Sequence, residues 1–362
     1  MRRLILLFLL LSIVFGVTST ALAVDSPQFD PTVCAQFTTG GTLSDQCMQM
    51  ITDFPRPPDV QAVPQDKYTL DTYSFWRVGP SPTPEYDAAN GNQISTIPQG
   101  FNFVRAIDTS VDGWIQIEGG KWIPTKDAKF TQPSYFTGET INDGLKYPFA
   151  FVLDKSHIYA SLYPGGPRTT ASGRYLNRYE MVNIFATAKD KDGWNWYMIG
   201  PNQWVEQRFV AKVQKITPPA GVTDRWVAVD LYEQTLVAYQ GDTPVFATLV
   251  ATGLPTHETA QGLFHVWANL PSDGMSGATG APSAYALQSV PWVMYFNGGM
   301  SLHGTYWHDL FGYRQSHGCV NLTISDAKWI YQWFQNGDPN KQIDNTVYVY
   351  SSGTYGVTAT GI

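Results

Sequence analysis

Near the carboxyl end of the chain, a cysteine follows two histidines. Cys319 lies two positions after His317 and sixteen after His303. A thiolate is a far better nucleophile than a thiol, and a free cysteine titrates near ~8.5, so an active cysteine needs a neighbouring base or cation. Sixteen positions allow a loop to fold His303 back over Cys319, whereas His317 is too close in sequence to exchange a proton well. The spacing therefore indicates nucleophilic catalysis.

The residues beside Cys319 favour a site that stabilises negative charge. Gly318 lets the backbone approach a substrate closely, so the amides of Gly318 and Cys319 are candidates to hold a developing oxyanion. Ser316, His317 and Asn321 are expected to line the same site.

These residues carry a resemblance to a known family. His303-Gly304-Thr305, followed by the run from Ser316 to Asn321, resembles the signature of the L,D-transpeptidase (YkuD-type) catalytic domain. The similarity extends over residues 261–264 and 291–296 and covers about residues 225–350. Residues 260–262 read Ala-Gln-Gly where many members have Thr-Pro-Gly, which affects a turn and leaves the chemistry untouched.

The resemblance implies a thioester mechanism on the stem peptides of peptidoglycan. Cys319 would be the nucleophile and His303 the base, oriented by the backbone carbonyl of Gly304. His317 would be a second histidine lining the site, and Tyr295 is a candidate for the donor pocket. An amine of a neighbouring stem would take the acyl group, no metal or cofactor would be needed, and carbapenem-type inhibitors are expected to react.

The amino terminus has the layout of a secretory signal peptide. Arg2 and Arg3 precede an apolar run of 14 residues, 4–17, and a cleavage segment with Ala21 and Ala23 follows it. The run is short of the roughly 20 residues that a membrane span needs. We expect residues 1–23 to be removed and the protein to be exported to the cell envelope, periplasmic or wall-associated.

Export changes how the three cysteines are interpreted. Outside the cytoplasm, thiols that can pair usually do so. Cys34 and Cys47 lie 13 positions apart in one polar segment, so a disulfide between them is predicted. Cys319 is then left without a partner, and an odd thiol in an exported protein is a candidate reagent.

The composition restricts the class of protein. The chain has 362 residues, of which 15% are charged and 14% aromatic, and its formal net charge is −7. So much aromatic surface excludes disorder over the whole length. A nucleic-acid partner is not expected, because phosphate binding needs a basic footprint.

Two segments of the chain resemble each other. Asp112-Gly113-Trp114 and Asp192-Gly193-Trp194 lie 80 positions apart, and each triplet is followed by alternating residues and a second Trp. The pattern resembles bacterial SH3-like domains, and two unrelated hairpins with the same turn chemistry are the alternative. Such domains would add wall glycan as a partner, although their tryptophans are more often core than sugar platforms.

The sequence therefore predicts a mainly β protein of several domains. After the signal peptide we expect an N-terminal segment with a proline-rich spacer (24–72) and two small SH3-like β-barrels (73–131 and 149–213). The last domain (222–352) would be an L,D-transpeptidase β-sandwich with one helix at 325–335. Ser325 is the expected cap of that helix, and Asp326 suits its dipole.

Other interpretations of the site stay open. Zinc would need ligands paired on two arms, and His317-x-Cys319 is too tight for that. Cys319 as a buried inert residue is the ordinary case for a lone cysteine. A papain-like wall endopeptidase would place its cysteine before its histidine. An L,D-carboxypeptidase would use the same residues, and a non-enzymatic wall-binding protein would not need Cys319.

Overall fold

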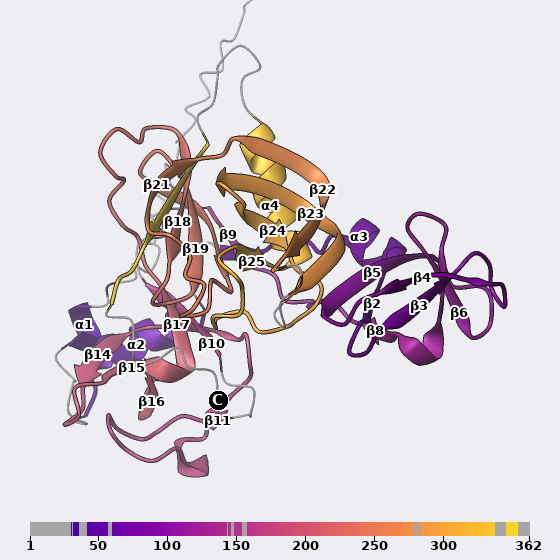
Figure 1. Ribbon diagram of the computed structural model, residues 1–362. Coiled ribbons are helices and arrows are strands. Elements are labelled where there is room, and N and C mark those ends of the chain that lie inside the picture. The colour runs from indigo at the N-terminus through magenta and orange to yellow at the C-terminus, as the bar shows by residue number, and fades with distance from the viewer. Residues whose placement is uncertain are drawn as a thin grey trace, which may run out of the picture.

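The computed structural model describes residues 30, 32–35, 42–56, 60–142, 144–145, 148–153, 158–278, 280, 284–336 and 345–353. The proposed signal peptide, residues 1–23, lies outside them. The structure is mainly β, as predicted (Figure 1). Among the helices in these residues, none has the length and apolar character to cross a membrane.

A seven-stranded sheet forms the centre of the molecule. Its strands run in the order β1 (Val60–Ala62), β9 (Glu139–Ile141), β20 (Thr243–Leu249), β19 (Thr235–Gln240), β18 (Arg225–Asp230), β26 (Thr346–Tyr350) and β21 (Gly262–His265). Strands β18 to β20 are buried almost throughout, in the way expected when both faces of a sheet are covered.

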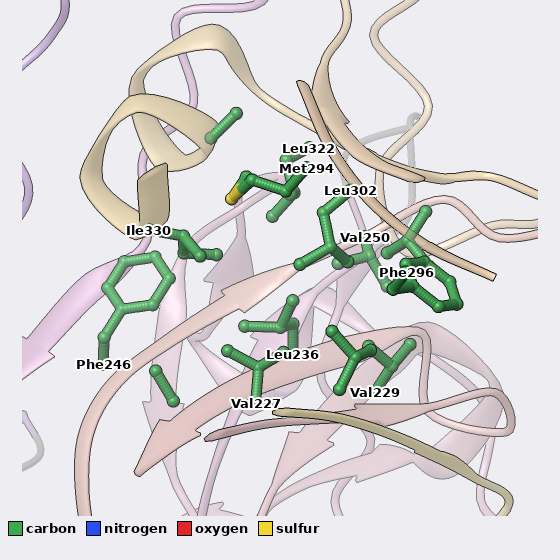
Figure 2. Packing of buried hydrophobic residues seen from close by; sticks show 14 of the residues in the cluster. Val227, Val229, Leu236, Phe246, Val250, Met294, Phe296, Leu302, Leu322 and Ile330 are labelled. Atoms are coloured by element: carbon green, nitrogen blue, oxygen red, sulfur yellow. The ribbon is translucent and has the colours of Figure 1, made fainter. Parts of the chain in front are cut away.

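A second sheet packs on one face of the central sheet. Its catalytic part runs through β25 (Val320–Leu322), β24 (Met300–Gly304), β23 (Tyr285–Asn297) and β22 (Ala268–Gly277). Figure 2 shows the core between the two sheets, where Val227, Val229 and Leu236 meet Met294, Phe296, Leu302 and Leu322. The sandwich predicted for this part of the chain is thus present.

One helix, α4 (Ile324–Gln335), closes the end of this core (Figure 1). Ile330 and Phe334 face the sheets. The expected cap at Ser325 is wrong, because the helix starts one residue earlier and Thr323 accepts from the N–H of Asp326 at 3.2 Å. The hydroxyl of Ser325 instead accepts from the backbone N–H of Asp66 at 2.9 Å.

The segment expected to be a proline-rich spacer contains elements bound to the catalytic part. Strand β1 pairs with β9, and helix α3 (Lys67–Thr72) is capped by Asp66. The buried carboxylate of Asp66 meets Lys328 of α4 at 2.6 Å and the indole N–H of Trp292 at 3.0 Å. The segment is therefore held to the catalytic part by strand pairing and by the contacts of Asp66.

Residues 73–131, called here the first accessory region, form a lobe beside the catalytic part (Figure 1). Its strands are β2 (Ser74–Val78), β3 (Thr83–Tyr86), β4 (Gln93–Ile97), β5 (Phe101–Asp108), β6 (Trp114–Ile117), β7 (Trp122–Pro124) and β8 (Lys129–Thr131), with a 3-10 turn at Thr125–Asp127. Strand β5 pairs in parallel with β23, so the lobe continues the catalytic sheet.

Residues 149–213, the second accessory region, cover the other face of the central sheet. The strands are β10 (Phe149–Val152), β11 (Ile158–Tyr159), β12 (Tyr175–Leu176), β13 (Met181–Asn183), β14 (Ala186–Lys189), β15 (Asn195–Gly200), β16 (Gln203–Glu206) and β17 (Val210–Val213), with 3-10 turns at Thr170–Ser172 and Gln207–Phe209. Phe149, Phe151 and Val213 pack against Trp226 and Tyr239 of the central sheet.

Both accessory regions repeat one order of elements: a strand, an Asp-Gly turn, two short strands, a 3-10 turn and a last strand. Gly113 and Gly193 have φ of 75° and 85°, the left-handed conformation that these turns need. The expectation of closed barrels is wrong for the described strands, because their hydrogen bonds form open sheets. The likeness to SH3-like domains stays a prediction.

A disulfide joins Cys34 of helix α1 (Thr32–Ala35) to Cys47 of helix α2 (Asp45–Asp53). Both cysteines are fully buried and pack against Trp196, Met198 and Trp204 of the second accessory region. The bridge therefore holds the two N-terminal helices together where they pack on this region, and Cys319 is the free cysteine.

Candidate active site

The two candidate catalytic residues lie on neighbouring parallel strands. Leu302 of β24 is opposite Val320 of β25, and His303 is opposite Asn321. Residues opposite each other point to the same side of a sheet and alternate along a strand. Since Cys319 directly precedes β25, its side chain shares a face with Ser301, His303 and Asn321.

Cys319 and His303 line one pocket of about 360 Å³. The thiol lies 3.7 Å from the hydroxyl oxygen of Ser301 and 3.7 Å from the carbonyl oxygen of Gly299. Cys319 is half-buried, and its burial raises the pKa of the thiol above its ordinary value. The thiol is therefore protonated at neutral pH, and attack on a substrate needs a base.

His303 has the features of such a base. Its side chain is buried, and that burial lowers the pKa of the imidazole to about 4, so the ring is neutral at pH 7. Nδ1 lies 3.2 Å from the carbonyl oxygen of Gly304, which can only accept, so Nδ1 carries the proton. The lone pair is left on Nε2, and the ring of Trp307 at 5.5 Å flanks the imidazole.

The loop before Cys319 is held by Ser316. Its hydroxyl donates to the carbonyl of Cys319 at 2.5 Å and accepts from the N–H of Gly318 at 3.1 Å. The expected oxyanion role of Gly318 is therefore not supported, since its amide already donates within the turn. Gly318 has φ of 115°, and a Cβ there would lie 3.2 Å from Met300. The geometry leaves the amide of Cys319 as the candidate oxyanion donor.

His317 lies in the turn before Cys319, next to the rings of His257 and Tyr285. Its ring centroid is 4.5 Å from that of His257 and 5.4 Å from that of Tyr285. Burial and the neighbouring His257 lower its pKa, so His317 is neutral at pH 7. His317 lines the pocket and does not belong to the pair formed by His303 and Cys319.

Of the remaining predicted site residues, two line the pocket and one does not. Asn321 and Ser316 line the pocket, and the amide nitrogen of Asn321 lies 2.9 Å from Nε2 of His308. Tyr295 does not line it: its hydroxyl donates to Asp273 at 2.8 Å, and its ring stacks on Trp267. Tyr295 is opposite Ser301, the residue that contacts the thiol, and therefore shares its face of the sheet.

Several residues of the site were missed by the sequence interpretation. Ser301 contacts the thiol, and the alternation of β24 two residues before His303 was a signal for it. Trp307, four positions after His303, also lines the pocket but was given no role. Tyr285 and Phe101 had no local signal, because long-range strand pairing brings them there.

Residues 224–349 match the profile of the YkuD family, described as the L,D-transpeptidase catalytic domain. The chain therefore contains an L,D-transpeptidase catalytic domain. It is 26% identical over 126 residues to "Putative L,D-transpeptidase YciB" of Bacillus subtilis strain 168, a match over 30% of this chain and 59% of that protein. The chain thus spans less than two thirds of its curated relative.

Solved structures with this domain are also similar. A crystal structure of an Enterococcus faecium L,D-transpeptidase mutant is 24% identical, with a TM-score of 0.31 over 36% of this chain and 50% of that chain. An L,D-transpeptidase from Stackebrandtia nassauensis is 27% identical, with a TM-score of 0.28 over 39% and 62% of the two chains.

The matched L,D-transpeptidase catalytic domain, residues 224–349, contains His303, His317 and Cys319. Within the residues described, no three His, Cys, Asp or Glu side chains gather as a metal-binding group. His303, His317 and Cys319 instead have the hydrogen bonds and ring contacts given above.

Proposed function

We propose that this protein is an exported peptidoglycan L,D-transpeptidase that works through a thioester on Cys319. The observation that carries the proposal is the placement of His303 and Cys319 on one face of neighbouring strands, lining one pocket. The neutral imidazole with its free Nε2 and the protonated thiol are the two forms that such a reaction needs at its start.

In the first half of the reaction, Nε2 of His303 takes the thiol proton as sulfur attacks the peptide carbonyl that follows an L-configured centre. The amide of Cys319 donates to the oxyanion. The C–N bond to the terminal D-alanine then breaks, and the departing amine receives the proton from His303. A thioester on Cys319 and free D-alanine result.

In the second half, an amine of a neighbouring stem attacks the thioester and gives a proton to His303. The C–S bond breaks, the proton returns to sulfur, and a new amide links the two stems. The energy of the first peptide bond is kept in the thioester, so the exchange needs no nucleotide.

Export of the protein rests on two features. The first 23 residues have the layout of a signal peptide, and the disulfide between Cys34 and Cys47 is a bond that persists in oxidising compartments. The proposed site of action is the cell envelope, where the peptidoglycan substrate lies.

The experiment is incubation of the mature protein with a disaccharide-tetrapeptide, followed by mass spectrometry of the products. The proposal predicts equal amounts of D-alanine and cross-linked dimer, with both lost in Cys319→Ala and His303→Ala. D-Alanine without dimer would identify an L,D-carboxypeptidase. Unchanged activity in Cys319→Ala would overturn the thioester mechanism, and wall binding without any product would identify a binding protein.

A further inference from the structure

The first accessory region supplies part of the wall of the catalytic pocket. Phe101, the first residue of β5, lines the same pocket as Cys319. It is held there because β5 pairs in parallel with β23, which places Phe101 opposite Tyr285, another pocket residue. Phe101 is 39% exposed, so its ring presents an apolar surface that a substrate can contact.

The ring of Phe101 also contacts a cationic side chain that lies outside the pocket. The guanidinium carbon of Arg77, on β2, lies 5.7 Å from the centroid of the Phe101 ring. Arg77 is exposed and lies directly opposite Lys129 of β8. Like charges in opposite positions destabilise a pair of strands, so this arrangement costs stability unless an anion neutralises it.

Arg77 and Lys129 line a second hollow together with Lys126. Its volume is about 320 Å³, and its other walls are Pro80, Ser81, Pro82, Thr83, Asp127 and Ala128. Within the part of the chain that the structure describes, none of the three cations has an ion-pair partner within 4.0 Å. One carboxylate, Asp127, thus faces three cations in a protein whose net charge is −7.

We propose that this hollow is an anion-binding subsite that extends the catalytic pocket. It binds a carboxylate of the donor peptide that is remote from the scissile bond. Phe101 contacts Arg77 and lines the pocket of Cys319, so one extended peptide crosses its ring from one hollow to the other. On the proposed function, on which this inference rests, the cations of this hollow select a stem peptide that carries a carboxylate.

The test compares two synthetic donor tetrapeptides on the full mature protein: one with free carboxylates remote from the scissile bond, and one with those carboxylates amidated. The variant is Arg77→Gln combined with Lys129→Gln. The matched control, Lys67→Gln with Lys189→Gln, removes the same charge from exposed lysines outside both hollows.

The proposal predicts that Arg77→Gln/Lys129→Gln raises the KM of the free-carboxylate donor about tenfold, with kcat within twofold. That factor corresponds to about 1.4 kcal/mol, the scale of one charge-assisted contact. The KM of the amidated donor should stay unchanged, and the control variant should alter neither donor.

Three outcomes would overturn the subsite. Equal changes in KM for both donors, or no change in KM for either, would show that the cations do not bind the carboxylate. Loss of binding to purified walls that carry phosphate polymers, with unchanged KM, would assign the hollow to those polymers. Acylation of Cys319 by imipenem in wild type and variant is measured in parallel, so failure of the catalytic proposal is seen separately.

Discussion

The two accessory regions share an order of elements but are joined to the catalytic domain in different ways. The first continues the catalytic sheet through β5 and places Phe101 in the pocket of Cys319. The second packs side chains onto the outer face of the central sheet. Its own hollow, of about 540 Å³, is lined by Trp194, Asp190 and Arg208 among others and contains no residue of the candidate active site.

The difference shows that a repeated fold can take a direct or an indirect part in one site. Strand pairing fixes position to within one residue, so the first region can present a chosen side chain to a substrate. Face-to-face packing covers the outer face of the central sheet, and none of the residues that line the pocket of Cys319 comes from the second region. We therefore expect changes in the first region to alter substrate recognition and changes in the second to alter stability alone.

The largest expected effect is at two stacked aromatic pairs. One pair lies where the first region meets the catalytic part, and the other lies inside the central sheet on the face that the second region covers. Tyr306 stacks on Phe75 at 3.8 Å, and Tyr239 stacks on Trp226 at 4.2 Å. Both tyrosines are fully buried, so Tyr306→Ala and Tyr239→Ala should each cost about 4 kcal/mol of unfolding free energy. Urea titration followed by tryptophan fluorescence measures this cost.

The value of kcat per folded molecule distinguishes the two aromatic pairs. Tyr306→Ala should lower kcat at least tenfold, because Tyr306 contacts Trp307, which flanks the ring of His303. Tyr239→Ala should keep kcat. The comparison fails if both variants lose activity equally at the same folded fraction.

The disulfide gives the next largest effect. Removing it by Cys34→Ala/Cys47→Ala frees a loop with a sequence separation of 13, which should cost about 3 kcal/mol of unfolding free energy where the N-terminal helices pack on the second region. Thermal unfolding measures the loss, while the initial rate of D-alanine release at 25 °C should stay within twofold of wild type. A large fall in that rate would contradict an indirect role for this region.

Glu139, in the segment between the two regions, gives a pH-dependent effect. Burial and the charge of Asp326 raise its pKa from 4.5 to about 7. A raised pKa in the folded state stabilises the fold below pH 4.5, and this contribution is lost as the pH rises through 7. The gain in unfolding free energy from Glu139→Gln should therefore be about 2 kcal/mol larger at pH 8 than at pH 4. This is less than the full pKa shift would give, because Asp326 titrates beside Glu139. Denaturant unfolding at both pH values measures the difference, and parallel wild-type and variant curves would contradict it.

The smallest effect compares one aromatic side chain from each region. Phe101→Ala should raise the KM of the donor peptide about fivefold, because the pocket loses an apolar wall worth about 1 kcal/mol. Trp194→Ala should leave KM unchanged, since Trp194 contacts Arg208 in the separate hollow. Steady-state kinetics on the tetrapeptide measures both, and an equal shift would remove the distinction between the regions.

The sequence was informative where the signal is local. The alternation of the strands and the helix that ends at Gln335 follow from periods of a few residues. The pair of His303 and Cys319 was found from a short motif only sixteen residues apart. The cap of that helix was misplaced by two residues because Thr323 and Ser325 can both cap, and only the burial of Asp66 decides between them.

Non-local features were not accessible in the same way. Alternation tells which face of β5 is buried but not which strand lies beside it, so the pairing of Phe101 with Tyr285 could not be foreseen. Likewise, the hydrogen bond from the amide of Gly318 to Ser316 depends on the conformation of the turn and could not be foreseen. Both are contacts that a residue pattern leaves undetermined.

The most direct test of the paired thiol and imidazole is intact-mass spectrometry of the folded mature protein after incubation with imipenem. The account predicts one adduct, mapped by digestion to Cys319, absent in Cys319→Ala and formed at least a hundredfold more slowly in His303→Ala. An unmodified wild-type protein, or an adduct that persists without Cys319, would contradict the account.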